Sequence, residues 1–164
     1  MIYLTVGTGI GVGVMVSGQL LHGMLHPEAG HMLVRARPTE EERCVCPSHA
    51  SCLEGLASGP AIAARWGKPA AELADNDEVW ALEGDYLGQM CANLVLMYSP
   101  RRIVLGGGVM HQEQLYGIVR KKTLEYLGGY IQPAELKDME SYICAPGCGG
   151  DQGILGAAEL ARRA

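Results

Sequence analysis

The sequence predicts an α/β domain, and three stretches of its 164 residues support that prediction. Residues 2–21 combine β-rich segments with glycines in period-two alternation, which is typical of strands. Residues 77–98 repeat apolar side chains at spacings of three and four, as one face of a helix does. Residues 102–126 contain a short apolar run, three glycines and a second helical pattern. We therefore expect a strand, a glycine turn and a helix in that last stretch.

The composition limits what the chain can do. Hydrophobic residues make up 48%, which is enough for a buried core, and a typical domain of roughly 150 residues predicts a single domain here. The formal charge is −5, from 13 basic and 18 acidic side chains, so a nucleic-acid partner is not expected. Glycine accounts for 23 of 164 residues, against a usual share of about 7%, and Phe is absent, so this is no ordinary helical bundle.

The chain carries no charged residue before Glu28, yet its opening predicts neither a signal peptide nor a membrane span. A signal peptide needs a basic n-region, and a span of about 20 residues needs a helix, whereas the alternating glycines indicate strands. We therefore expect a cytoplasmic protein with no membrane partner. In a reducing compartment, a close cluster of cysteines indicates metal or redox chemistry more often than disulfide bonds.

The opening hairpin is expected to contain a tight glycine turn. Residues 2–6 favour a strand, residues 7–13 hold four alternating glycines, and an apolar run continues over residues 12–21. The glycine segment is not a Walker A loop, because no Lys-Ser or Lys-Thr follows, and it fits Gly-x-Gly-x-x-Gly in no register. Its bare amides and the Thr8 hydroxyl could approach an anion closely. A glycine hairpin without a ligand explains the pattern equally well.

The chain changes character over residues 25–52, where three prolines and a charged stretch make long regular elements improbable. We expect a loop module there, with one short strand at residues 31–35. Gly59-Pro60 then suits the start of a helix over residues 61–66, because proline is favoured near the first helical position.

The longest predicted helix covers residues 77–98, where Asp75 or Asn76 can cap its start and Ser99-Pro100 stops it. Asp151 is best explained as the N-cap of the last helix. The elements expected after the long helix are a strand at 102–105, a glycine turn at 106–108, a helix at 114–126, a strand at 141–145, a turn at 146–150 and a helix at 151–163.

The strongest chemical signal is a set of five His and Cys residues close together in the loop module. Zinc needs four soft or borderline donors in a tetrahedron, and this set oversupplies it. An inert or redox-active cluster is the alternative. A metal with all four positions filled by protein would be structural, and it would fold a module that is poor in apolar residues. The candidate donors are His31, Cys44, Cys46, His49 and Cys52.

The triple glycine of Gly106, Gly107 and Gly108 follows a predicted strand and precedes a helix. α/β proteins bind nucleotides at such positions, because the backbone can approach the ligand closely. A tight turn between packed elements is the alternative interpretation.

Other cysteines and histidines carry weaker signals. Cys144 and Cys148 could form a second metal pair or a redox couple, but no further ligand lies nearby, so a buried thiol and a turn residue are expected. His22, His26 and His111 have no partner pattern and are expected to be solvated or structural.

Four motifs taken together resemble those of the ROK family of sugar kinases, and within it the bacterial fructokinases. Their order and spacing cover the chain essentially from end to end, and the joint match is more specific than any single motif. The motifs are Gly7-Thr8-Gly9-Ile10-Gly11, His26-Pro27-Glu28-Ala29-Gly30-His31, Cys46-Pro47-Ser48-His49-Ala50-Ser51-Cys52-Leu53-Glu54-Gly55 and Gly106-Gly107-Gly108-Val109.

The resemblance implies an actin-like, ribonuclease-H-like ATPase domain of residues 1–164 with a zinc-binding loop module at about residues 25–58. Two nucleotide contacts are implied by the matching positions. The turn of Gly7, Thr8 and Gly9 would lie against the ATP phosphates, and the triple glycine of residues 106–108 would lie near the adenosine.

The resemblance also implies a sugar site and a ligand set for structural zinc. Glu28 would hold sugar hydroxyls, and His31 would be both a zinc ligand and a sugar contact. The fructokinase pattern Cys-Pro-x-His-x-x-Cys adds Cys46, His49 and Cys52 as the other zinc ligands. Many other family members have their first ligand cysteine at the position of Cys44, so this chain carries both options.

The activity implied is transfer of the γ-phosphate of ATP, with magnesium, to the 6-hydroxyl of D-fructose or a related hexose by a homodimer. Family members also carry an Asp-x-Gly-Gly-Thr phosphate loop and a catalytic aspartate in Asp-Val-Asn, and neither pattern occurs here. We therefore expect that the N-terminal ATPase domain is absent and that this chain alone is inactive. The alternatives are a glucose or mannose kinase, the sugar-sensing domain of a ROK-type repressor, and a purely structural dimerisation domain.

Overall fold

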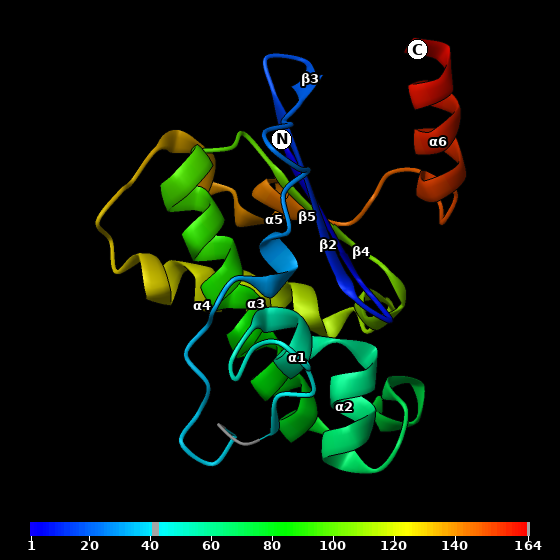
Figure 1. The fold of residues 1–164 in the computed structure, drawn as a ribbon. Coiled ribbons are helices and arrows are strands. Elements are labelled where there is room, and N and C mark those ends of the chain that lie inside the picture. The colour runs from blue at the N-terminus through cyan, green and yellow to red at the C-terminus, as the bar shows by residue number, and fades with distance from the viewer. Residues whose placement is uncertain (41–42, 164) are drawn as a thin grey trace.

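The structure of the chain is a computed structural model that describes residues 1–40 and 43–163. Its centre is a five-stranded sheet in the order β3-β2-β1-β4-β5 (Figure 1). The β1–β2 and β2–β3 pairs are antiparallel, whereas β1–β4 and β4–β5 are parallel. The strands are β1 (Ile2–Val6), β2 (Ile10–Val16), β3 (Gln19–Leu20), β4 (Ile103–Gly106) and β5 (Ile143–Cys144).

Two long helices pack against one face of the sheet, and shorter helices join them at the ends of the strands (Figure 1). The α-helices of the described residues are α1 (Leu53–Ala57), α2 (Gly59–Trp66), α3 (Asp77–Tyr98), α4 (Gln114–Leu127), α5 (Met139–Tyr142) and α6 (Gln152–Arg163). The 3-10 helices are η1 (Ala29–His31), η3 (Ala70–Leu73), η4 (Gly108–His111) and η5 (Ala134–Lys137).

The core lies between the sheet and the helices α1, α3 and α4. Successive side chains of a strand point to opposite faces, so only alternate residues of β1 can face the helices. Those residues are fully buried, and they share one hydrophobic cluster with alternate residues of β2 and β4 and with the inner side of α3. The sheet residues in this cluster are Ile2, Leu4, Val6, Ile10, Val12, Val14, Ile103 and Leu105.

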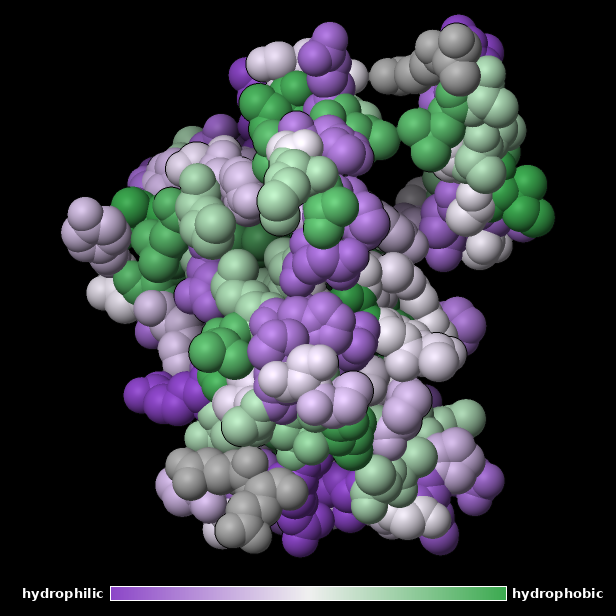
Figure 2. Space-filling view, viewed as in Figure 1, coloured by the Kyte–Doolittle hydropathy of each residue, from purple (hydrophilic) through white to green (hydrophobic). Residues whose placement is uncertain are grey.

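The last helix, α6, stands apart from the body on the other side of the sheet (Figure 1). Figure 2 shows hydrophobic side chains on the tip of the β2–β3 hairpin and on α6, facing each other across an open groove. The groove has a volume of about 420 Å³ and is lined by Met15, Leu20 and Leu160 among others. None of the helices in the described part of the chain has the length and apolar character that crossing a membrane requires.

Several predicted elements are confirmed because their signals are local. α3 has the predicted bounds, and the Asn76 side chain caps it by accepting a hydrogen bond from the Glu78 amide. α4 and β4 each lie within one residue of the prediction. The opening hairpin is also present, although its turn is confined to residues 7–9 and β2 already begins at Ile10.

One expected strand is wrong, one helix was missed and one strand is shorter than expected. Residues 31–35 do not form a strand: His31 ends η1, and the only pairing nearby among described residues is an isolated bridge between Leu33 and Cys52. Helix α1 was not expected, because its five residues are too few to show a helical period. The predicted strand at residues 141–145 is reduced to β5, since α5 occupies the preceding turn.

Candidate functional site

Four of the five candidate metal donors come together in the loop module. The donor atoms of His31, Cys46, His49 and Cys52 all lie within 4.8 Å of one another. The Cys46 sulfur is 3.3 Å from His49 Nδ1 and 3.8 Å from His31 Nδ1, and the Cys52 sulfur is 3.7 Å from His31 Nδ1. A tetrahedral zinc with ordinary bond lengths separates its sulfur and nitrogen donors by roughly 3.6 Å. The cluster could therefore hold a metal ion with little movement.

The fifth candidate, Cys44, is directed elsewhere. Its thiol donates a hydrogen bond of 3.1 Å to the His49 carbonyl and is not one of the four grouped donors. The absence of a side chain at Gly55 makes room for it, because a Cβ at that position would lie 2.2 Å from the Cys44 sulfur. Cys44 thus supports the loop around His49.

Short backbone contacts hold the donors in place. Cys52 is buried at the N-cap of α1, where its sulfur accepts a hydrogen bond from the Gly55 amide. The next residue, Leu53, donates its amide to the Met32 carbonyl at 3.0 Å, which ties α1 to the segment that follows η1. The donors from the two ends of the module therefore meet at the start of one helix.

The two cluster cysteines differ in their acidity. Hydrogen bonds, above all from the Ser48 backbone, lower the pKa of Cys46 to about 7, so a good part of it is thiolate near neutral pH. Burial raises the pKa of Cys52 to about 11. A metal bound here must displace the Cys52 proton, because thiolate is the ligand form.

The two glycine segments meet at one edge of the sheet. β1 and β4 are parallel neighbours, so the residues after both strands lie at the same edge. A Cβ on Gly7 would lie 3.9 Å from the Gly108 amide nitrogen, and one on Gly107, with φ +93°, would lie 2.4 Å from the Val6 carbonyl oxygen. The turn at residues 7–9 is also held by the Gly59 amide, which donates a 2.7 Å hydrogen bond to the Gly7 carbonyl. Thr8, in the middle of this turn, is exposed.

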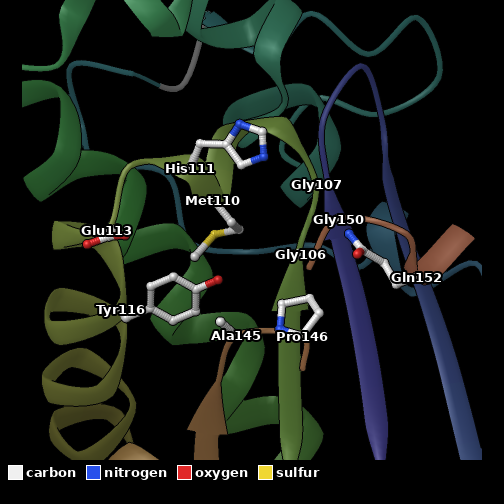
Figure 3. Close-up of a pocket in the computed structure, with 10 residues that line it drawn as sticks. All are labelled: Gly106, Gly107, Met110, His111, Glu113, Tyr116, Ala145, Pro146, Gly150 and Gln152. Carbon is white, nitrogen blue, oxygen red and sulfur yellow. The ribbon is translucent and has the colours of Figure 1, made fainter. Parts of the chain in front are cut away.

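A pocket of about 340 Å³ opens beside the triple glycine (Figure 3). It lies between the end of β4, the start of α4 and the segment that leads into α6. Figure 3 shows the Gln152 amide directed into it, and within the described residues the buried Gln152 Oε1 atom has no hydrogen-bond partner. Its lining residues are Gly106, Gly107, Met110, His111, Glu113, Tyr116, Ala145, Pro146, Gly150 and Gln152.

Sequence reasoning missed part of this pocket. His111 was expected to be solvated or structural; it is exposed, and it also lines the pocket. Gln152 carries no pattern of its own and is recognisable only from its buried, unpartnered atom. Of the two other cysteines, Cys148 is exposed in the turn as expected, and Cys144 is only partly buried.

The two acidic candidates of the module are placed differently. The side chain of Glu28 is 58% exposed and pairs with His26 at 2.7 Å. Glu54, which had no role in the sequence interpretation, lies between the cluster and the glycine turn: one carboxylate oxygen accepts the Ile10 amide, and the other is 3.5 Å from His31 Nε2. A carboxylate behind a metal-binding histidine orients the ring and raises its basicity.

Solved structures identify the class of protein to which this fold belongs. A ROK family glucokinase from Streptomyces griseus, solved in complex with glucose and AMPPNP, matches with a TM-score of 0.77 and 27% sequence identity. The match covers 99% of this chain and 60% of the glucokinase. The fold is therefore that of the actin-like ATPases, and the predicted fold class is confirmed.

Sequence comparison makes the assignment more specific. Residues 1–164 match the ROK family, and the chain belongs to it. A relative from Bacillus subtilis (strain 168) is 46% identical over 164 residues, which are 99% of this chain and 55% of the relative. The fructokinase of Pediococcus pentosaceus is 41% identical over 163 residues, which are 99% of this chain and 56% of that protein. The chain thus spans about half the length of these relatives.

Proposed function

We propose that this chain is the C-terminal half of an ATP-dependent fructokinase, which transfers the γ-phosphate of ATP to the 6-hydroxyl of D-fructose. The observation that carries the proposal is the meeting of two glycine segments at the carboxyl ends of β1 and β4, beside the His/Cys module. Relatives that are named fructokinases and share about two-fifths of the residues support fructose as the sugar. A cytoplasmic location fits the six free cysteines.

The nucleotide would lie across the sheet edge. The turn of Gly7, Thr8 and Gly9 would receive the phosphates of magnesium-bound ATP, and residues 106–108 would lie along the adenosine. The pocket beside β4, with the unpartnered Gln152 oxygen, supports this placement because a bound base or ribose could donate to that oxygen. Phosphoryl transfer depends mainly on positioning and on stabilising charge.

The sugar would be held by Glu28 and His31 of the module, with the Nε2 proton of His31 shared between a sugar hydroxyl and the Glu54 carboxylate 3.5 Å away. A carboxylate that accepts hydrogen bonds from neighbouring hydroxyls distinguishes hexoses better than an apolar wall does. A structural zinc on His31, Cys46, His49 and Cys52 would keep this loop ordered before the sugar arrives. The site is expected to work in a homodimer, as the family resemblance implies.

The metal proposal is tested by elemental analysis of the purified chain. One zinc per chain is expected, because the donor set is complete and soft. His49→Ala should lose the metal, whereas Cys44→Ala should keep it, since the Cys44 thiol bonds to a backbone carbonyl instead. A chain that keeps its zinc without His49 and loses it without Cys44 would refute this ligand set.

The kinase proposal is tested by joining the N-terminal half of the Pediococcus pentosaceus fructokinase to this chain. The chain alone should show no turnover with fructose and Mg-ATP, and the joined protein should form ADP in a fructose-dependent manner. Glu28→Gln should raise KM for fructose, whereas Glu72→Gln, which removes a charge from an exposed position, should not. A joined protein that prefers glucose or mannose would overturn the assignment of the sugar.

A further inference from the structure

Glu54 connects the His/Cys cluster to the glycine turn through two contacts of one carboxylate. It is the second residue of α1, two positions after the cluster ligand Cys52. Its Oε2 accepts a 2.8 Å hydrogen bond from the amide of Ile10, which is the first residue of β2 after the turn. Its Oε1 lies 3.5 Å from Nε2 of His31. The side chain is 30% exposed, so solvent only partly screens these contacts.

Two glycines allow the turn and η1 to pack closely around Glu54 and Ile10. A Cβ on Gly9 would lie 2.7 Å from Glu54 Oε2, so a side chain at this position would displace the carboxylate. A Cβ on Gly30 would lie 1.8 Å from the Ile10 carbonyl oxygen, so η1 packs directly on the start of β2. Three segments of the module and hairpin thus converge on the peptide at Ile10.

The orientation of the His31 ring determines which of its nitrogens can bind the metal and which faces Glu54. Its Nδ1 faces the sulfurs of Cys46 and Cys52, so a metal held by them would bind that nitrogen. The ring proton would then be on Nε2, which faces the Glu54 carboxylate. With its other oxygen, the same carboxylate holds the Ile10 amide.

We propose that Glu54 is a positioning residue that transmits occupancy of the metal cluster to the phosphate turn, through the His31 Nε2 proton on one side and the Ile10 amide on the other. The inference rests on the proposed zinc site and phosphate turn. It adds that the metal orders the turn as well as the loop module. A purely structural Glu54 would stabilise both regions without linking them.

The test is a titration of the zinc-free chain with Zn²⁺, followed by nitrogen-15 NMR of the backbone amides and of the His31 ring. Zinc should shift the Ile10 amide resonance and slow its hydrogen exchange, although Ile10 is not a ligand. Glu54→Gln should abolish this response, move the His31 Nε2–H resonance, and weaken zinc binding about tenfold or more, as loss of a ligand-orienting carboxylate does. Glu72→Gln is the matched control and should behave like the parent chain.

A second variant guards against a folding defect in Glu54→Gln. Glu54→Asp keeps the charge but is one methylene shorter, so it cannot hold both partners; it should lose the Ile10 response and retain a folded amide spectrum. If zinc binds and Ile10 does not respond, or if both Glu54 variants respond like the parent, the coupling is refuted while the metal site stands. If the chain binds no zinc, the metal site and the coupling fail together.

Discussion

Glu83 on α3 is 1% exposed, and among the described residues its Oε1 atom has no hydrogen-bond partner. Burial raises the pKa of this carboxyl well above its ordinary value of 4.5, and the nearby Arg65 guanidinium only partly opposes the effect. A carboxyl that is neutral in the native state and ionised in the unfolded state makes stability depend on pH. Glu83 is therefore a site where a small change should stabilise the protein.

Replacing Glu83 with Gln should stabilise the chain at neutral and alkaline pH. The native state binds the proton more tightly than the unfolded state does, so the parent loses stability as the pH rises from 4.5 toward the raised pKa of Glu83. The loss is about 1.4 kcal/mol per pH unit over that window. Urea unfolding at pH 4.5, 6 and 8 should show that the free energy of unfolding of the variant, relative to that of the parent, increases from each pH to the next. A difference between variant and parent that is the same at all three pH values would show that the pKa of Glu83 is not raised in the native state.

At the residue scale, the sequence could group the candidate metal donors because they are local in the chain. The five candidate donors lie within residues 31–52, and their short spacing suggested a shared ion; the structure brings four of them together. Glu54 was not assigned, because its partner Ile10 lies 44 residues away and no spacing rule connects them. Gln152 was not predicted for a similar reason: its side-chain oxygen is unusual only because the fold buries it without a hydrogen-bond partner among the described residues.

At the scale of elements, the most extensive contact in the described part of the chain is the crossing of α3 and α4. Two glycines of α3 face α4 directly: a Cβ on Gly84 would lie 2.4 Å from Ile118 Cγ2, and one on Gly88 would lie 2.4 Å from the Cβ of Lys122. The helices can approach this closely only where α3 carries no side chain. Asp85, in the same stretch of α3, accepts a hydrogen bond from the Tyr126 hydroxyl of α4.

Two identical substitutions in these helices should have opposite effects. Gly84→Ala should destabilise the chain by about 1–3 kcal/mol, because the added methyl overpacks the crossing. Gly117→Ala on α4 meets no atom within 4 Å and should stabilise it by about 0.5–1 kcal/mol through helix propensity. Thermal unfolding of the two variants and the parent measures both changes in stability. Stabilisation by Gly84→Ala would show that the helices separate more easily than their packing implies.

The accuracy of the element predictions follows the length of each pattern. α3 was predicted to the residue because its period repeats over six turns of helix. The false strand at residues 31–35 arose from a run of apolar residues that looks like a strand, yet Leu33 is 64% exposed while Val34 is buried under the module. A pattern of four or five residues is too short to distinguish a strand from a loop that buries a single apolar side chain.

At the scale of the whole molecule, the unusual feature is the exposed apolar surface of α6 and the hairpin. Ile154 is 76% exposed, and Leu155, Leu160 and Leu20 are each more than half exposed. Contiguous apolar surface of this kind promotes association. The groove between α6 and the hairpin tip is open in Figure 2, so a second copy of the chain could reach both of its walls.

The double substitution Ile154→Glu with Leu160→Lys should reduce self-association of the chain without changing its net charge. Both side chains are exposed, so the free energy of unfolding should change by no more than about 0.5 kcal/mol. Sedimentation velocity over a range of concentrations, with urea unfolding as the control, separates the two effects. Self-association that is unchanged in the variant would show that a different surface mediates it.

The pairing of β1 with β4 also determines how the chain must fold. The β1–β2 hairpin is local and can form within microseconds, whereas Ile2 pairs with Ile103, about 100 residues further along the chain. During synthesis, the second edge of β1 therefore stays unpaired until the ribosome has released β4. Slow, non-local pairing of this kind exposes strand edges that can join the wrong partner. The arrangement that brings the two glycine segments together thus leaves one edge of β1 exposed for most of the chain's synthesis.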